Sequence, residues 1–378
     1  MFSTCITTVL ILSSLSFAQN MPASTAPPTR LAHLHHGINL YGWFAQVYEP
    51  ERYTKEHFQS WITSADIALI KSAGFDHVRL SVNPEPIIQA TARADHGAEY
   101  LGYLDSAVKM ILDASLSVEL DIHPDSDFKA RLAREDDAVE RFADFWRMLA
   151  QHYASWDSDR VFFEILNEPE MRDAYRWYGV EAKLAAAIRQ AAPAHTILAP
   201  GARWDDDDDM IFLEPLRDPN VIYVFHFYEP HIFTHQGATW GEYYWRWLGH
   251  LHYPSQPENA AEVAARVPEA LDRLYVIRYG QDHWDASRIE AEINQAADWA
   301  AHNHVRLVCN EFGVYRDFSE PQDRAAWIKD VRVSLERHHI GWAMWDYSGG
   351  FGVATKKDGK AVLDEITVRA LGLTMPAQ

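Results

Sequence analysis

Two glutamates at the ends of apolar segments are the residues of this chain best suited to catalysis. Glu168 lies in FFEILNEPE and Glu311 in LVCNEFG. Either one alone could be a helix cap or an ion-pair partner, because an unpaired buried charge is costly. Together, on different strands, they could form the carboxyl pair that cleaves a glycosidic bond, one as proton donor and the other as nucleophile or base. A separation of about 5 to 5.5 Å between them would indicate the retaining mechanism.

Eight short apolar segments alternate with helical patterns and could hold both glutamates in place. In the longer segments, apolar residues recur at steps of three and four, which is typical of amphipathic helices. Strands that alternate with helices indicate a parallel sheet. The strands are predicted at 35–44, 77–82, 117–124, 161–169, 196–204, 221–230, 305–314 and 341–350, and the helices at 64–74, 99–115, 138–155, 172–192, 285–302, 321–338 and, with a weaker pattern, 361–372.

The polar residues of these strands stand mainly at their C-terminal ends, which is where a (β/α)8 TIM barrel places its active site. An open doubly wound sheet alternates in the same way but usually has a glycine-rich first turn, and neither GxGxxG nor GxxxxGK[ST] occurs here. The predicted fold is therefore an α/β TIM barrel. Residues 231–284, after the sixth strand, are too long and too rich in tryptophan and tyrosine for a simple or disordered loop. We expect a folded insertion with short helices beside the active-site face.

The N-terminus has the pattern of a secretory signal. Residues 1–18 contain a short apolar run followed by small residues, although no Lys or Arg precedes the run. Residues 19–30 are expected to be a flexible leader and residues 31–378 a single catalytic domain. The apolar run is too short to span a bilayer as a helix. We therefore expect a secreted or periplasmic protein with no membrane association after signal cleavage.

The net charge and two acidic segments bear on which partners and cofactors the chain could bind. The net charge of −20 repels nucleic acid, and it does not oppose a neutral polymer. The aspartate run at 205–209 is interpreted as a helix N-terminus, where acidic residues are favoured, rather than as a cation site. The segment 121–127 resembles spaced metal ligands, but no matching His–Asp set occurs on the first and eighth strands. We expect no metal and no cofactor.

The order of the motifs adds a resemblance to a known family. GINLYGWF, GFDHVRLSV, LDIHP, EILNEPE, FHFYEP, CNEFG and WAMWDYSGG occur in that order across residues 35–350. The chain resembles glycoside hydrolase family 5, the cellulase family of two-glutamate TIM barrels. The combination of NEP, a later EFG and an intervening HxY is the specific part of the match, since each motif alone is weak.

The resemblance implies a role for each of eight residues. Glu168 would be the acid/base and Glu311 the nucleophile, with Arg79 keeping the nucleophile ionised and Tyr228 hydrogen-bonding it. The other four would contact the substrate or the acid/base: Asn167 as ligand of the sugar 2-hydroxyl, His226 near the acid/base, His123 on the substrate side, and Trp345 as the aromatic floor under the cleaved sugar.

The expected activity is that of a secreted retaining endo-β-1,4-glucanase acting as a monomer on a β-glucan polysaccharide or oligosaccharide. The alternatives within the family are a β-mannanase, a β-1,3-glucanase or a xyloglucanase. A non-catalytic carbohydrate-binding barrel and a metal-dependent barrel hydrolase are the alternatives outside it. Pro124 stands where many relatives have a second histidine, which puts some sugar contacts in doubt. The tryptophans expected to stack on sugars are Trp43, Trp204, Trp240 and Trp345.

Overall fold

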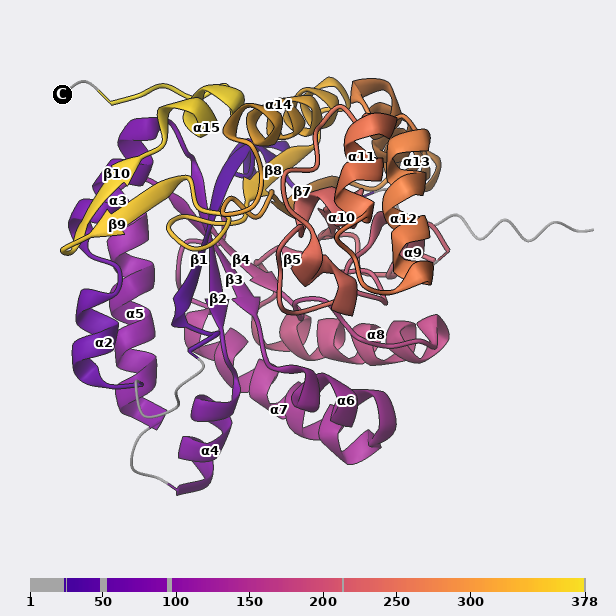
Figure 1. The fold of residues 1–378 in the computed structure, drawn as a ribbon. Helices are drawn as coiled ribbons and strands as arrows, with labels where there is room; N and C mark the ends of the chain where they lie inside the picture. Colours follow the sequence, from indigo (N-terminus) through magenta and orange to yellow (C-terminus); the bar gives the residue numbers. More distant parts are fainter. Residues whose placement is uncertain (1–23, 25, 48–52, 94–96, 213, 377–378) are drawn as a thin grey trace, which may run out of the picture.

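The computed structural model describes residues 24, 26–47, 53–93, 97–212 and 214–376. Eight parallel strands close into a barrel in sequence order, so the predicted TIM-barrel fold is confirmed (Figure 1). No helix within the described residues is both long enough and apolar enough to cross a membrane. The strands are β1 His36–Phe44, β2 His77–Val82, β3 Ser117–Ile122, β4 Val161–Glu164, β5 Ile197–Ala199, β6 Val221–Phe227, β7 Leu307–Phe312 and β8 Gly341–Met344.

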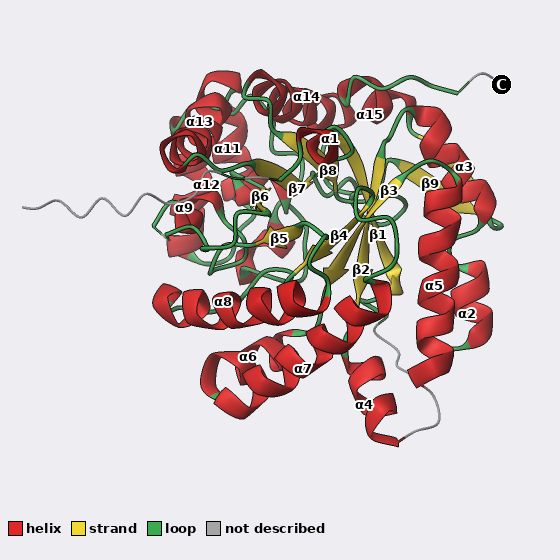
Figure 2. Ribbon diagram, turned by 180° about the vertical axis from the view of Figure 1, so that it is seen from behind, coloured by secondary structure: helices red, strands yellow, loops and turns green. Residues whose placement is uncertain are grey.

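Helices surround the barrel and cover the outer face of its strands (Figure 2). Their starts are fixed by local capping: in α3, Thr63 and Asp66 form a reciprocal capping box, and in α13 the side chain of Asp285 accepts two backbone N–H bonds. Three helices in the predicted loops, α2, α4 and α6, were not expected. The helices between strands are α2 Lys55–Ser60, α3 Ser64–Ala73, α4 Glu85–Arg93, α5 Gly97–Asp113, α6 Ser126–Arg134, α7 Asp136–Tyr153, α8 Ala174–Ala191, α9 Asp207–Met210, α13 Ala286–Asn303, α14 Pro321–Arg337 and α15 Glu365–Ala370.

Part of the segment expected to be a flexible leader is folded against the barrel. Helix α1, Pro28–Leu31, precedes β1, and the guanidinium group of Arg30 is buried. It donates to Asp159 over 2.9 Å and to Thr196 over 2.9 Å, which lie just before β4 and β5. Helix α1 therefore covers the N-terminal end of the barrel, where a buried cation is held by these acceptors. The predicted signal peptide, 1–18, lies outside the described residues.

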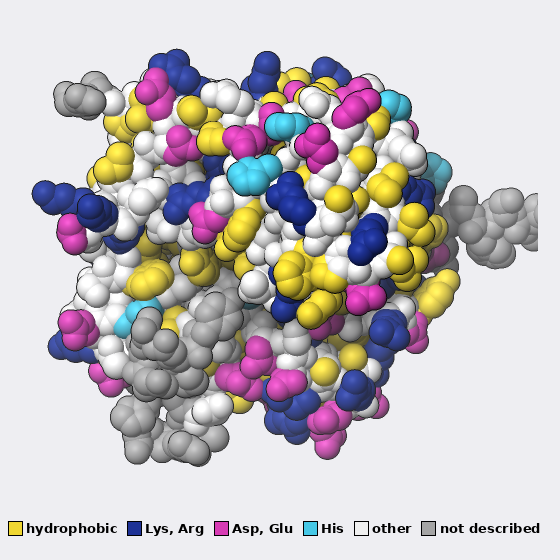
Figure 3. Space-filling model, viewed as in Figure 1, with side chains coloured by type: hydrophobic (Ala, Val, Ile, Leu, Met, Phe, Trp, Pro, Cys, Tyr) yellow, Lys and Arg dark blue, Asp and Glu magenta, His cyan; other side chains and the backbone are white. Residues whose placement is uncertain are grey.

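The insertion after β6 is folded, as predicted, and contains short helices. Its core is made of buried aromatic rings, whereas other rings of the same segment remain exposed; Figure 3 shows apolar side chains on the surface over these elements. The buried set is Trp245, Tyr253, Tyr279 and Trp284. The elements are α10 His231–Thr234, the 3₁₀ helix η2 Tyr243–Trp247, α11 Pro257–Ala264 and α12 Ala270–Gln281.

The predicted weak helix at 361–372 is wrong in its first part. Strands β9, Ala354–Lys357, and β10, Lys360–Leu363, form an antiparallel hairpin beside α3 (Figure 1). The two turn residues, Asp358 and Gly359, both have positive φ, of 50° and 73°. This is the geometry that an Asp-Gly pair favours in a two-residue hairpin. Helix α15 begins only at Glu365.

Candidate active site

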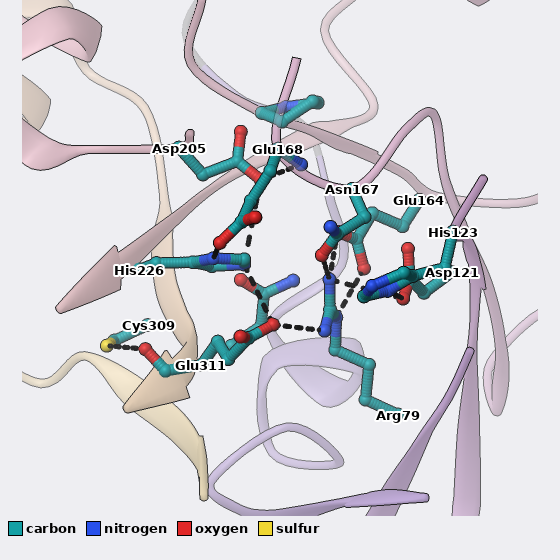
Figure 4. Close-up of polar contacts among 12 residues, drawn as sticks. Arg79, Asp121, His123, Glu164, Asn167, Glu168, Asp205, His226, Cys309 and Glu311 are labelled. Atoms are coloured by element: carbon teal, nitrogen blue, oxygen red, sulfur yellow. Dashed lines mark hydrogen bonds and ion pairs between the residues drawn. The ribbon is translucent and has the colours of Figure 1, made fainter. Parts of the chain in front are cut away.

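The structure brings all eight predicted site residues together at the C-terminal end of the barrel. Figure 4 labels six of them: Arg79, His123, Asn167, Glu168, His226 and Glu311. Most of the eight lie in or directly after a strand. The exceptions are Asn167 and Glu168, because β4 ends at Glu164 and not near residue 169 as predicted. The polar residues of this motif belong to a loop. Arg79 lies in β2, His226 in β6 and Glu311 in β7, while His123, Tyr228 and Trp345 directly follow β3, β6 and β8.

Hydrogen bonds from two successive backbone amides hold the loop that carries Glu168. The amide of Asn167 donates to the carbonyl of Ile122 over 2.8 Å, which ties the loop to β3. The amide of Glu168 donates to the carboxylate of Asp205 over 2.8 Å. Glu168 itself has a φ of 44°, in the left-handed region that a glutamate rarely adopts. Its side chain is 28% exposed, so a substrate can reach it.

Glu311 is buried and receives hydrogen bonds on both oxygens. The hydroxyl of Tyr228 donates to Oε1 over 2.8 Å, and Nη1 of Arg79 donates to Oε2 over 2.8 Å. Burial and the charge of Glu311 raise the pKa of Tyr228 well above its usual value, so that its hydroxyl remains a donor. Both oxygens of the proposed nucleophile thus accept a hydrogen bond from a fixed donor.

The guanidinium of Arg79 uses all five of its N–H donors. Two of them form a bidentate pair with Glu164, at 2.7 and 2.8 Å. The other three reach Asn39 over 2.9 Å, Asn167 over 2.9 Å and the Glu311 carboxylate. Burial lowers the pKa of Arg79, but the surrounding carboxylates outweigh it and raise that pKa well above the ordinary value. Arg79 is therefore a permanent charge that fixes the positions of Asn167 and Glu311.

The site holds more carboxyl groups than Arg79 alone can balance. Asp121 lies 3.3 Å from the guanidinium and accepts from His123 Nδ1 over 2.8 Å. Burial raises the pKa of Asp121, but Arg79 and His123 outweigh burial and lower it. Burial and the charge of Glu164 raise the pKa of Glu119 well above its usual range, while Arg79 and the hydrogen bond from Asn310 oppose the rise.

His226 lies between the two proposed catalytic glutamates (Figure 4). Its Nδ1 is 3.0 Å from Oε1 of Glu168, and its Nε2 is 3.4 Å from Oε2 of Glu311. Burial lowers the pKa of His226, but Glu311, Glu168 and Asp205 raise it, to about 9. Burial raises the pKa of Glu168, but its hydrogen bond to His226 and the charges of His226, Lys129 and His123 lower it to about 2. In the substrate-free protein the shared proton therefore resides on His226.

Aromatic rings form one wall of the site. Trp345 packs with Tyr228 and Phe351, and its ring lies 5.9 Å from that of His123 at an angle of 19°. Of the other tryptophans expected to stack on sugars, Trp204 is 53% exposed and Trp240 is 48% exposed. Trp43 is buried and donates its indole N–H to the carbonyl of Phe58 over 2.8 Å. The prediction for Trp43 is therefore wrong, because its ring belongs to the core.

Four buried acidic residues of the site were not predicted as site residues: Glu119, Asp121, Glu164 and Asp205. Asp121 and Glu164 interrupt otherwise apolar strands, and that interruption was a visible signal, since a buried carboxylate needs a cation or a donor. Asp205 gave no such signal. It opens the aspartate run that was interpreted as a helix N-terminus, and α9 does begin two residues later.

Among the residues that the structure describes, two groups of side chains have the spacing of metal ligands. One consists of Glu164, Asp205 and His226, and the other of Glu168, His226 and Glu311. The second group is the proposed catalytic set, and the first shares His226 with it. Within each group one ligand atom per residue lies within 4.8 Å of the others. This gives the separation of the catalytic pair: one carboxylate oxygen of Glu168 and one of Glu311 are no more than 4.8 Å apart.

Two glutamates held this close on the C-terminal face of a closed barrel place the protein among the (β/α)8-barrel glycoside hydrolases. The family model for cellulase (glycosyl hydrolase family 5) matches residues 43–350. The chain therefore belongs to glycosyl hydrolase family 5, as its motifs indicated.

Individual relatives agree with this assignment. Endoglucanase C of Acetivibrio thermocellus is 31% identical over 340 residues, which are 87% of this chain and 96% of that protein. Cellodextrinase A of Ruminococcus flavefaciens is 27% identical over 317 residues, 80% of this chain and 82% of that protein. The crystal structure of endoglucanase Cel5A from Thermotoga maritima superposes with a TM-score of 0.73 at 25% identity, covering 90% of this chain and 98% of the other.

Proposed function

We propose that this glycoside hydrolase is a retaining endo-β-1,4-glucanase, with Glu311 as the nucleophile and Glu168 as the acid/base. The observation that carries the mechanism is the separation of at most 4.8 Å between carboxylate oxygens of the pair. Inverting enzymes hold the two carboxyl groups about 6.5 to 9.5 Å apart to admit a water molecule. The shorter separation supports double displacement.

In the first step, a carboxylate oxygen of Glu311 attacks the anomeric carbon and the bond to the leaving oxygen breaks. The leaving oxygen takes a proton from Glu168. Because the substrate-free pair keeps its proton on His226, the 3.0 Å contact between His226 Nδ1 and Glu168 Oε1 is the route by which the proton reaches Glu168. Asn167, fixed by Arg79, is placed to hold a sugar hydroxyl.

In the second step, water attacks the anomeric carbon of the glycosyl–Glu311 ester. Glu168 accepts the proton of that water and returns it to His226, and the ester bond breaks to regenerate the Glu311 carboxylate. The sugar is released with its original anomeric configuration. Arg79 and Tyr228 stabilise the carboxylate as it leaves.

Substrate choice is inferred from relatives and from the aromatic rings. The relatives named endoglucanase support a β-1,4-glucan, and the exposed rings of Trp204 and Trp240 are suited to stacking on sugar faces. A mannan, a β-1,3-glucan or a xyloglucan would use the same catalytic pair, because linkage preference depends on a few hydroxyl contacts.

The cellular setting is also part of the proposal. A polymer substrate outside the cell, together with the signal pattern of residues 1–18, supports secretion or export to the periplasm. We also propose that the enzyme acts as a monomer. It needs no metal, since the charges of Arg79 and His226 and the hydroxyl donor of Tyr228 serve the mechanism.

A hydrolysis panel tests the function. Wild-type enzyme should act most strongly on carboxymethyl cellulose and barley β-glucan, and less on laminarin, mannan, xyloglucan and xylan. Glu168→Gln and Glu311→Gln should each lose most of this activity, while Glu320→Gln, which alters an exposed carboxylate paired with His250, should keep it. Activity that survives both catalytic changes would exclude the assignment, and inverted products by NMR would exclude the retaining mechanism.

A further inference from the structure

The environment of Asp205 points to a role in catalysis that the family assignment does not supply. Asp205 lies in the loop after β5 and is completely buried. Its Oδ2 accepts the amide N–H of Glu168 over 2.8 Å, and its backbone carbonyl accepts the amide N–H of His226 over 2.8 Å. The same Oδ2 lies 3.6 Å from Nε2 of His226. One residue thus contacts both members of the pair that holds the catalytic proton.

The backbone on either side of this contact is unusual. Glu168 has a positive φ of 44°, and Trp204 and Asp205 have positive φ of 52° and 57°. These conformations cost roughly 1 kcal/mol or more each, and they persist where surrounding contacts impose them. The amide of Trp204 donates to the carbonyl of Pro169 over 3.0 Å, so a second hydrogen bond joins the two loops directly after the Glu168 amide.

We propose that Asp205 is a positioning residue for the acid/base: its carboxyl group holds the peptide of Glu168 in the left-handed conformation that points the Glu168 side chain at His226 and at the leaving oxygen. β4 ends four residues before Glu168, so the strand ladder does not fix this peptide. Without the acceptor, the Glu168 amide would lose its hydrogen-bond partner at a part-buried position, and the loop would turn to satisfy it.

The acceptor role does not need a negative charge on Asp205. Burial raises the pKa of Asp205 well above its usual value, against the opposing effect of His226, and Glu164 and Glu168 add to the rise. Glu181 of α8 is a further buried acid, and burial and the charge of Asp205 raise its pKa well above the usual range. A neutral carboxyl still offers a carbonyl oxygen to the Glu168 N–H. The amide of an asparagine offers the same oxygen, so Asp205→Asn should preserve the function that Asp205→Ala removes.

Leaving-group dependence separates this role from a structural one. This inference rests on the proposed function, so the test uses aryl β-cellobiosides that span poor to good leaving groups. A good leaving group such as 2,4-dinitrophenolate departs without a proton, whereas phenolate and a sugar alkoxide need general acid catalysis, which contributes roughly 10²–10⁴-fold. A misplaced acid therefore lowers the rate only for the poor leaving groups.

We expect Asp205→Ala to lower kcat/KM on phenyl β-cellobioside and cellotetraose by about 10- to 100-fold, as a displacement of about 1 Å does elsewhere. On 2,4-dinitrophenyl β-cellobioside the change should stay within about threefold, and Asp205→Asn should recover most of the loss. Asp206→Ala is the matched control, because the neighbouring Asp206 makes no side-chain cap to α9. It should behave as the wild type does.

Active sites are counted by the burst of dinitrophenolate released when a 2-fluoro-cellobioside traps Glu311, so misfolded enzyme does not enter the rates. A loss that is equal for all leaving groups, or no loss at all, would overturn the positioning role. If Asp205→Ala does not fold, Asp205→Asn decides: a leaving-group-dependent loss as large as that of Glu168→Gln would also overturn it, since the acceptor oxygen is retained. A wild-type enzyme that gives no burst and no activity on any cellobioside would instead refute the proposed function.

Discussion

Replacing Arg79 by lysine should weaken the fold and the catalytic site together. All five N–H donors of the guanidinium are used, two of them in a bidentate pair with the buried Glu164 carboxylate. A lysine ammonium has three donors and cannot reproduce the planar fork. At least two hydrogen bonds to charged or buried partners are lost, at about 1.5–3 kcal/mol each, so we expect the free energy of unfolding to fall by about 3–6 kcal/mol.

Denaturant unfolding followed by tryptophan fluorescence measures this loss, and kcat/KM on a cellobioside measures the effect on Glu311. The bond from Arg79 to Glu311 is also charge-assisted, so its loss should lower kcat/KM by roughly 10- to 150-fold. The control is Arg369→Lys, which changes an exposed i,i+4 pair with Glu365. It should change the stability by less than about 0.5 kcal/mol.

The reasoning would be wrong if Arg79→Lys unfolded within about 1 kcal/mol of the wild type. Such a result would mean that an ammonium serves the buried carboxylates as well as the guanidinium does. A variant that is destabilised but fully active would refute a narrower point, the dependence of the Glu311 charge on Arg79.

Three further outcomes follow from groups of the site and core. Tyr228→Phe removes the 2.8 Å hydrogen bond to Glu311 and should lower kcat/KM by about 10- to 150-fold in initial-rate assays, so a change below threefold would count against it. The pKa of His226 is raised to about 9, so the pair of His226 and Glu168 keeps its proton below that pH and loses it above. The alkaline limb of kcat/KM should therefore lie near pH 9, and it should move to lower pH in His226→Gln. An alkaline limb at or below pH 6.5 in the wild type would contradict this. Burial lowers the pKa of His195 to about 4, and Arg30 and Arg189 add to the effect. Between pH 6.5 and 4 the unfolded chain therefore binds a proton at His195 that the folded protein does not. The free energy of unfolding should fall by up to about 3 kcal/mol over that range. His195→Phe, whose ring can keep the stacking on Phe163, should flatten that dependence in pH-dependent unfolding, and an unchanged slope would refute the assignment.

The sequence was sufficient for the barrel and for the residues at its rim. Parallel strands buried on both faces are continuous apolar runs, and a polar residue at the end of such a run marks the C-terminal face. Arg79, His226 and Glu311 stand in the strands where this pattern put them. The order of the motifs then indicated the family, and the matching family model confirmed the assignment.

The sequence was insufficient where a backbone turn decides the outcome. The apolar residues Ile165 and Leu166 extend the run of β4, so the strand was predicted to reach residue 169, but it ends at Glu164. The hairpin at β9 and β10 did have a signal, the Asp358–Gly359 pair, but the hydrophobic pattern was interpreted as helical instead. Trp43 was expected among the tryptophans that stack on sugars, but its ring is buried and its indole N–H donates to the carbonyl of Phe58, fifteen residues further along the chain.

Asp205 shows why some site residues cannot be predicted from their neighbours in the sequence. Within WDDDDDM, five aspartates have nearly the same neighbours, and from the sequence the whole run was interpreted as a helix N-terminus. Asp205 turns its side chain inward against the loop after β4, whereas Asp209 is buried in an ion pair with Arg203 and Asp208 remains exposed. That difference arises from two loops more than thirty-five residues apart, joined by the bond from Glu168 to Asp205, with a sequence separation of 37. Asp205 takes its positioning role because the closed barrel brings these two loops together. From its charge alone, the residue would have been predicted at the surface.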